Sequence, residues 1–175
     1  MNKELITPVI FVSLLFCFFH VHAQYRTKEI IEYIKWIEAN SPEEKGWEEK
    51  MSNVIEIVQE LEFDIVINAS LTSPLIYEEG YLYHKELAQL FLLNSIEYCI
   101  RNKTYTDIEA NIAGIKGMLQ YYKFLKTKKP EEVSLVMEGY EKMDRDSTMD
   151  SYINRQMMKL GEKDSVDLWQ IKDAK

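Results

Sequence analysis

Beyond the first 23 residues, the most apolar stretch of the chain runs from residue 86 to residue 100. On a helical wheel, Leu87 and Phe91 share one side and Ile96 falls on another, so that no side is wholly polar. A helix with this pattern is typical of a position that is surrounded by other elements. We therefore expect a buried central helix over about residues 84–101.

Apolar residues at helical spacing also occur on both sides of this stretch, whereas the turn signals of β-hairpins are absent. The predicted helices run from Arg26 to Asn40, from Pro42 to about Ile67, from Thr106 to Lys129, from Pro130 to a break at Asp144, and from Ser147 to Gly161. The connection over residues 68–80 is expected to pack on the bundle, with room for a short helix after Pro74. The pattern predicts an all-α, single-domain bundle of five or six helices around the central one.

Two of these helices are predicted to begin with a capping box, in which a hydroxyl and a later carboxylate each bind the other's backbone N–H group. Ser41 and Glu44 have the required spacing, and so do Thr106 and Glu109. Ser147 is expected to cap the last helix. These signals locate helix starts independently of the apolar spacing.

Small residues form a strip along the helix that follows the central one. The strip consists of Ala110, Ala113, Gly114 and Gly117. Glycine inside a helix costs about 1 kcal/mol relative to alanine, so two glycines here predict the close approach of a neighbour. The central helix is that neighbour, because a short connection makes the two helices antiparallel. Asn94 interrupts an apolar stripe of the central helix and will need hydrogen-bond partners if it is buried.

The first 23 residues have the layout of a secretory signal peptide. Lys3 precedes an apolar run from Leu5 to Phe19, and residues 21–23 resemble a cleavage site. An uncleaved anchor and lipidation at Cys17 are the alternatives. We expect cleavage to leave an all-helical domain over residues 24–175, exported to the periplasm or the extracellular space and without stable membrane insertion.

The net charge of −8 limits the classes of molecule that we expect the protein to bind. An acidic surface disfavours nucleic acids and anionic membranes, and it is compatible with a basic protein or simply with solubility. Glu48, Glu49 and Glu56 are expected on the outer face of the second helix. They are candidate interface residues if the partner is basic.

Few catalytic or metal-binding chemistries remain after the leader is removed. His84 and Cys99 are then the only histidine and the only cysteine, so zinc sites built from these residue types are excluded. The two lie about 22 Å apart along one straight helix, which prevents them from acting as a pair. We expect Cys99 to be a buried thiol and predict no catalytic, cofactor-binding or metal-binding residue. Catalysis by a pair of carboxylates is not excluded in this way, because acids are abundant throughout the chain.

Tyrosines gather before the central helix, at Tyr77, Tyr81 and Tyr83, next to His84. Tyrosine is favoured where one end of a side chain is buried and the other is wet. That description fits the rim of a core, the mouth of a ligand pocket or a protein interface. We treat these four residues as candidates for an interface.

Asn68 and Asn102 each begin a glycosylation acceptor pattern, completed by Ser70 and Thr104. Both patterns fall in predicted loops. Modification at either position depends on a host that glycosylates its exported proteins.

Three functions fit these observations. The first is a binding protein without enzymatic activity, such as an inhibitor or immunity-type protein for a basic toxin or hydrolase. The second is a glycan or cell-wall hydrolase that uses two carboxylates. The third is a carrier that holds an apolar ligand between helices, in a cavity lined by Phe91, Leu92, Tyr98 and Tyr122.

Overall fold

A computed structural model of the 175-residue chain describes residues 25–60, 65–102 and 104–162. These residues form a helix over 25–39, α2 (Trp47–Glu60), the 3-10 turn η2 (Ala69–Leu71), α3 (Ser73–Ile76), α4 (His84–Arg101), α5 (Asp107–Lys128), α6 (Leu135–Arg145) and α7 (Met149–Glu162). No strand occurs among them. The predicted all-α class is confirmed. The short helix predicted after Pro74 is α3, which begins at Ser73 and includes Pro74.

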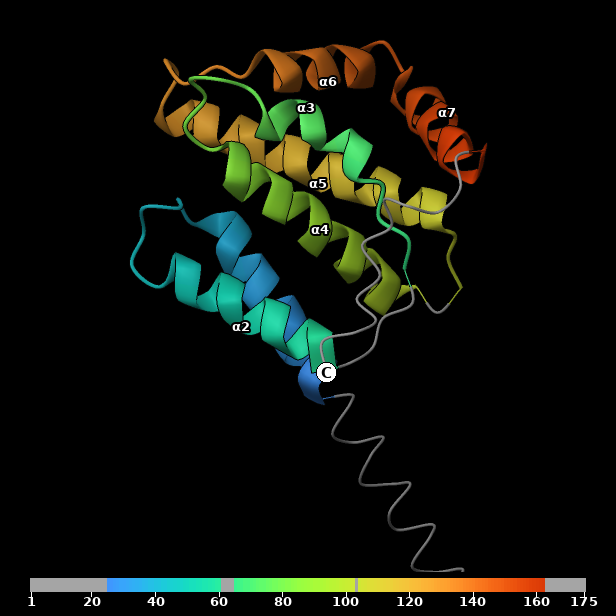
Figure 1. Ribbon diagram of the computed structural model, residues 1–175. Coiled ribbons are helices and arrows are strands. Elements are labelled where there is room, and N and C mark those ends of the chain that lie inside the picture. The colour runs from blue at the N-terminus through green and yellow to red at the C-terminus, as the bar shows by residue number, and fades with distance from the viewer. Residues whose placement is uncertain (1–24, 61–64, 103, 163–175) are drawn as a thin grey trace, which may run out of the picture.

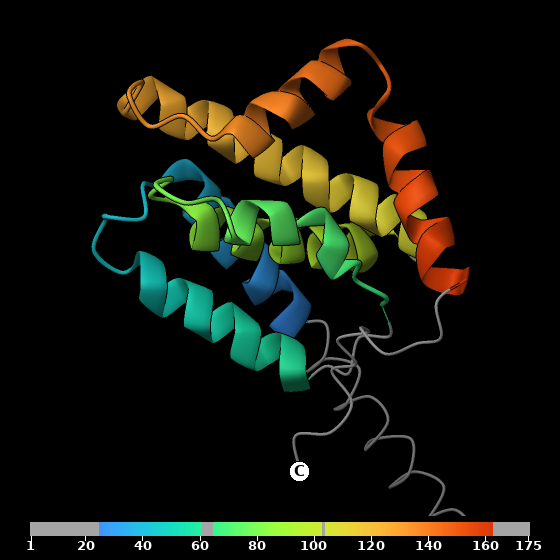
Figure 2. The same cartoon turned by 45° about the horizontal axis from the view of Figure 1, so that its top comes forward.

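The antiparallel helices α4 and α5 form the centre of the bundle (Figure 1). The helix over 25–39 and α2 lie on one side of this pair, and α6 and α7 lie on the other (Figure 2). The short α3 packs on α4 and contacts α6. α4 buries residues on several sides, namely Leu87, Leu90, Phe91, Leu93, Ser95, Ile96 and Cys99. The prediction of a buried central helix is confirmed with the expected bounds.

The small-residue strip brings α4 and α5 into close contact. A Cβ atom added to Gly114 would lie 2.2 Å from Oγ of Ser95 and 2.7 Å from the carbonyl oxygen of Phe91. A Cβ atom added to Gly117 would lie 1.9 Å from Cγ of Asn94. Asn94 therefore occupies the space that a side chain at position 117 would need. Its Nδ2 donates a hydrogen bond to the carbonyl of Leu90 at 2.9 Å, which satisfies part of the amide.

The start of α5 confirms one predicted capping box. Oγ1 of Thr106 accepts a hydrogen bond from the backbone N–H of Glu109 at 3.2 Å. The Glu109 carboxylate in turn accepts from the backbone N–H of Thr106 at 2.8 Å. Both partners of this motif are local in sequence, so the helix start follows from four consecutive residues.

The predicted start of α2 at Pro42 is wrong, because the helix begins at Trp47. Ser41 bonds to the carboxylate of Glu43 instead of forming the capping box. Two backbone turns follow, and Gly46 ends them with a φ of +93°, a conformation that glycine adopts without strain. The indole N–H of Trp47 then donates to the carbonyl of Ile37 at 3.3 Å, which joins α2 to the preceding helix.

The predicted end of α2 near Ile67 is also wrong. Residues 65–67 are not helical, and residues 61–64 lie outside the described part of the chain. Oδ1 of Asn111 accepts from the backbone N–H of Asn68 at 3.0 Å, and its Nδ2 donates to the carbonyl of Val66 at 2.8 Å. The segment is therefore held in an extended form by a side chain of α5.

The bounds of α6 and α7 differ from the prediction as well. α6 begins at Leu135 rather than Pro130, with Ser134 as its N-cap. Ser147 does not cap α7: its φ is +56°, and α7 begins at Met149. Gly161 lies inside α7 rather than after it. The predicted break between the two helices is confirmed.

Two further expectations concern parts of the chain outside the described residues. The first is the signal peptide over residues 1–23. The second is a docked C-terminal tail, which the apolar residues Val166, Leu168 and Trp169 predict. Among the helices that the structure describes, none has both the length and the apolar character required to cross a membrane.

Candidate protein-binding surface

The candidate tyrosines before α4 differ in exposure. Tyr77 is 81% exposed, whereas Tyr81 and Tyr83 are only 4% and 3% exposed. Nδ1 of His84 lies 2.9 Å from the carbonyl oxygen of Tyr81, so the His84 ring contacts the backbone of the turn that precedes α4. Of the candidates at this end of the bundle, only the ring of Tyr77 is openly available to a partner.

The buried ring of Tyr83 belongs to a junction between three parts of the chain. Its hydroxyl donates to the carboxylate of Glu43 at 2.5 Å, and Nζ of Lys129 pairs with the same carboxylate. Nζ of Lys129 also lies 5.5 Å from the centre of the Tyr83 ring. The hydrogen bond from Lys129, followed by those from Ser41 and Tyr83, lowers the pKa of Glu43 from 4.5 to about 2.

This junction predicts a pH-dependent contribution to stability. A carboxyl whose pKa is lower in the folded chain stabilises it above the unfolded pKa and loses that effect as the pH falls. Glu43→Gln should therefore lower the midpoint of urea unfolding at pH 7, and the difference from the original chain should shrink between pH 4.5 and about 2. The effect is modest because both charged groups are partly exposed. Glu44→Gln, at an exposed neighbour, is the control; a deficit of Glu43→Gln that stays constant down to pH 2 would contradict the assignment.

Glu78 joins the segment before α4 to the start of α6. One oxygen of its carboxylate accepts from Oγ of Ser134 at 2.5 Å, and the other accepts from the backbone N–H of Leu135 at 2.5 Å. A carboxylate at a helix N-terminus satisfies free N–H groups and interacts favourably with the helix dipole. The two segments are thus fixed beside each other, although 57 positions separate Glu78 from Leu135 in sequence.

A second contact joins the same segments at their other edge. The ring centres of Tyr81 and Tyr122 are 6.2 Å apart, in an edge-to-face arrangement. The hydroxyl of Tyr122 accepts from the backbone N–H of Ser134 at 3.3 Å and donates to the carboxylate of Glu138 at 2.7 Å. Residues on both sides of Tyr81 and of Ser134 are therefore held in a defined arrangement.

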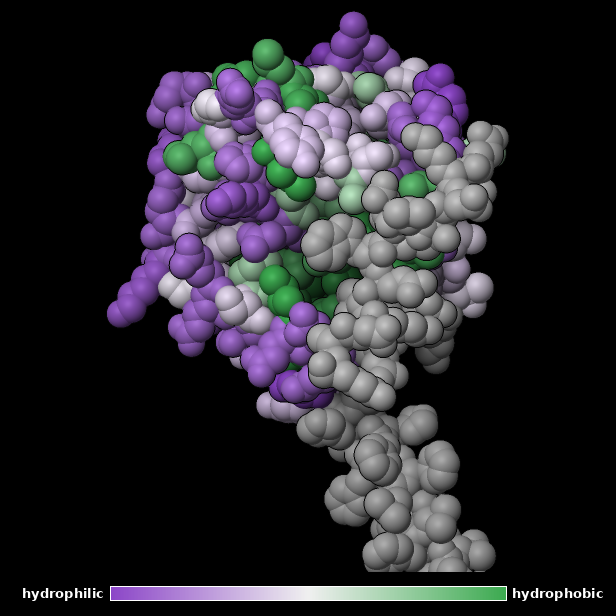
Figure 3. Space-filling view, viewed as in Figure 1, coloured by the Kyte–Doolittle hydropathy of each residue, from purple (hydrophilic) through white to green (hydrophobic). Residues whose placement is uncertain are grey.

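Exposed apolar side chains gather on these two segments. Of the seven large apolar side chains that are exposed among the described residues, five belong here: Ile76, Tyr77, Leu82, Val133 and Leu135. We call these five the end surface. Figure 3 shows apolar side chains at the top of the molecule, over α3 and the segment that leads into α6. Single exposed apolar residues are normal, whereas several on neighbouring segments make this surface a candidate interaction site.

The backbone explains why Val133 and Leu135 face outwards together. Ser134 has an extended conformation, with φ −96° and ψ 123°. Side chains alternate between the two sides of an extended segment, so the buried Ser134 leaves both of its neighbours on the outer side. Val133 falls inside the helix that the sequence predicted to begin at Pro130. Because α6 begins only at Leu135, with Ser134 as its N-cap, Val133 lies before the helix and is exposed.

The acidic candidates on α2 form a separate face. Glu48, Glu49 and Glu56 are exposed, as expected, on the side of α2 that points away from the bundle. The buried residues of α2 are Trp47, Met51, Val54, Ile57 and Val58. None of the five side chains of the end surface comes from α2, so charged and apolar candidates lie on different elements.

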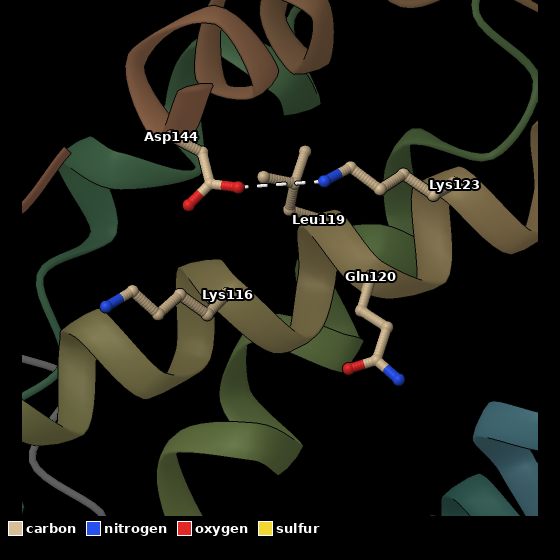
Figure 4. A pocket seen from close by; sticks show the side chains of 5 residues that line it. All are labelled: Lys116, Leu119, Gln120, Lys123 and Asp144. Atoms are coloured by element: carbon tan, nitrogen blue, oxygen red, sulfur yellow. Dashed lines mark ion pairs between the residues drawn. The ribbon is translucent and has the colours of Figure 1, made fainter. Parts of the chain in front are cut away.

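A shallow hollow of about 290 Å³ lies between α5 and α6 (Figure 4). Its lining residues are Lys116, Leu119, Gln120, Lys123 and Asp144. Nζ of Lys123 lies 3.6 Å from the carboxylate of Asp144, which joins the two helices. With one carboxylate, this hollow does not offer the pair of acids that glycoside hydrolysis needs. Of the four residues expected to line a carrier cavity, Phe91 and Tyr122 are buried in the core, and none lines this hollow.

Two of the remaining candidates for chemistry, Cys99 and Asn68, are buried. Burial raises the pKa of the Cys99 thiol to about 11, so the nucleophilic thiolate is scarce at neutral pH. Asn68 is 1% exposed, which places this glycosylation acceptor out of reach in the folded chain. Among the described residues, no group of three or more His, Cys, Asp or Glu side chains could hold a metal ion.

The chain matches no protein-family model, no curated protein and no solved structure.

Proposed function

We propose that this protein acts by binding another protein, and that the end surface is its binding site. The observation that carries the proposal is the gathering of five exposed apolar side chains on two segments that Glu78 and Tyr122 hold together. A surface that is ordered before binding loses little conformational entropy when a partner docks. Exposed tyrosine is also enriched among residues that contribute most to binding.

Within this class, an inhibitor or immunity-type protein is the form that we propose. Such a protein needs an ordered contact surface and no reacting group of its own. The expected signal peptide would place its action outside the cytoplasm. The hydrolase and carrier functions have no comparable observation in their favour.

Paired substitutions on the end surface test this proposal. The full chain, tagged at its C-terminus and expressed in its native host, should capture a partner that Tyr77→Ser combined with Leu135→Ser no longer retains. Loss of two exposed anchors is expected to weaken binding by about 30-fold, which corresponds to about 2 kcal/mol. Quantitative mass spectrometry of the captured proteins measures the difference, and urea unfolding checks that the variant keeps its stability.

Met158→Ser is the matched control, because Met158 is also exposed but belongs to α7. It should capture the same partner as the original chain. Equal capture by all three proteins would show that the end surface is not the binding site.

A further inference from the structure

The charges around the end surface indicate what kind of protein it binds. Residues 76–83 and 130–135 contain four glutamates and neither lysine nor arginine. Glu78 is occupied at the start of α6, whereas Glu79 and Glu131 are exposed beside the apolar side chains. The apolar centre therefore has an acidic margin.

The nearest cations offset this margin only in part. Lys129 pairs with Glu43, and Lys126 pairs with Glu138 at 2.6 Å, so both charges are matched within the chain. Lys85, in the first turn of α4, and the exposed Lys128, at the end of α5, can offset part of the acidic charge. Burial and the neighbouring tyrosines raise the pKa of Tyr81, and the carboxylates of Glu132 and Glu78 add smaller contributions in the same direction. Acids from both segments therefore act on the same buried side chain.

We propose that the partner of the end surface is a basic protein, which places apolar side chains on Ile76, Tyr77, Leu82, Val133 and Leu135 and surrounds them with lysine or arginine. This inference rests on the proposed function and adds the chemistry of the partner. Opposite charges around an apolar centre speed the encounter of two proteins and disfavour partners of the wrong sign. The open ring of Tyr77 adds a site where an arginine can stack.

Charge reversal separates this inference from the proposed function. In the capture experiment, Glu79→Lys combined with Glu131→Lys should reduce partner recovery by about tenfold, because like charges then face each other. Glu48→Lys combined with Glu49→Lys makes the same change of net charge on the exposed face of α2. Because that face was the acidic candidate from the sequence, this matched variant tests it against the end surface. The matched variant should retain the partner.

Three synthetic amphipathic peptides of equal length provide a direct probe with the purified full chain. One combines leucine with lysine, the second replaces lysine by glutamate, and the third replaces leucine by serine. Titration calorimetry should give at least about tenfold tighter binding of the first peptide than of either other one. Its affinity should fall steeply toward about 1 M salt, where the Debye length is about 3 Å.

The outcomes distinguish the two proposals. If Tyr77→Ser with Leu135→Ser abolishes capture but reversal at Glu79 and Glu131 acts no more strongly than reversal at Glu48 and Glu49, the surface binds a protein and the basic partner is wrong. If the serine–lysine peptide binds as well as the leucine–lysine peptide, the contact is charge alone, and the proposed apolar–basic occupant is overturned. If the apolar substitutions leave capture unchanged, the proposed function itself fails.

Discussion

Gly114→Ala should destabilise the protein by at least about 3 kcal/mol, at the upper end of what overpacking a core usually costs. The added Cβ would lie 2.7 Å from both the carbonyl oxygen and a ring carbon of Phe91, and 2.2 Å from Oγ of Ser95. A backbone carbonyl cannot rotate away as the end of a flexible side chain can. The helices α4 and α5 must therefore separate, which opens the contact between the two central helices of the bundle.

Gly139→Ala is the matched control for this change. Gly139 also lies inside a helix, but a Cβ atom added to it would meet nothing within 4 Å. Its replacement should stabilise the protein by about 1 kcal/mol, because alanine is the better helix former. Urea unfolding followed by circular dichroism compares the two variants. Equal midpoints for both would mean that the close approach of α4 and α5 does not determine stability.

Asn111→Ala should cost about 2–4 kcal/mol, because one buried and one partly buried backbone group lose their partners. Asn111 is fully buried, and it binds the backbone N–H of Asn68 and the carbonyl of Val66. The substitution removes both bonds and also leaves a small cavity. Because Asp107 supports the same segment through the N–H of Val66 at 3.1 Å, the extended segment should loosen rather than leave α5 entirely.

Asn154→Ala serves as the control, because the side chain of Asn154 bonds within α7 on the exposed side, to the carbonyl of Asp150 at 2.8 Å. This variant should stay within about 0.5 kcal/mol of the original chain. Hydrogen exchange should show faster exchange at Asn68 only in Asn111→Ala. Unchanged protection of that amide would refute the role given to Asn111.

Features that depend on neighbouring residues could be predicted from the sequence. The apolar pattern located α4 at its observed bounds, and the pair Thr106 and Glu109 located the start of α5. The strip at Gly114 and Gly117 predicted the contact between these helices. In each case the signal lies within the element itself or in the one that adjoins it.

Features that depend on distant residues could not be predicted. Ser41 and Glu44 have the spacing of a capping box, but Lys129, 86 positions away, pairs with Glu43 between them and fixes a turn instead. The role of Asn111 depends on a segment more than 40 positions earlier. The end surface arises in the same way, because Glu78 holds the segment before α4 beside the start of α6. The sequence placed Tyr77 among the candidates. Leu82, Val133 and Leu135 were not predicted, because their surface depends on the contact between the two segments.

The adjacency of α4 and α5 in the chain has a consequence for how the protein folds. Residues 102–106 are the whole connection between them, so their contacts require the closure of only a short loop. Local contacts of this kind form early, because little chain entropy is lost before they are made. The outer helices can then assemble on opposite sides of a hairpin that is already present, in either order. The N-terminal and C-terminal helices would thus pack on the same hairpin, and the packing of one group would not depend on that of the other.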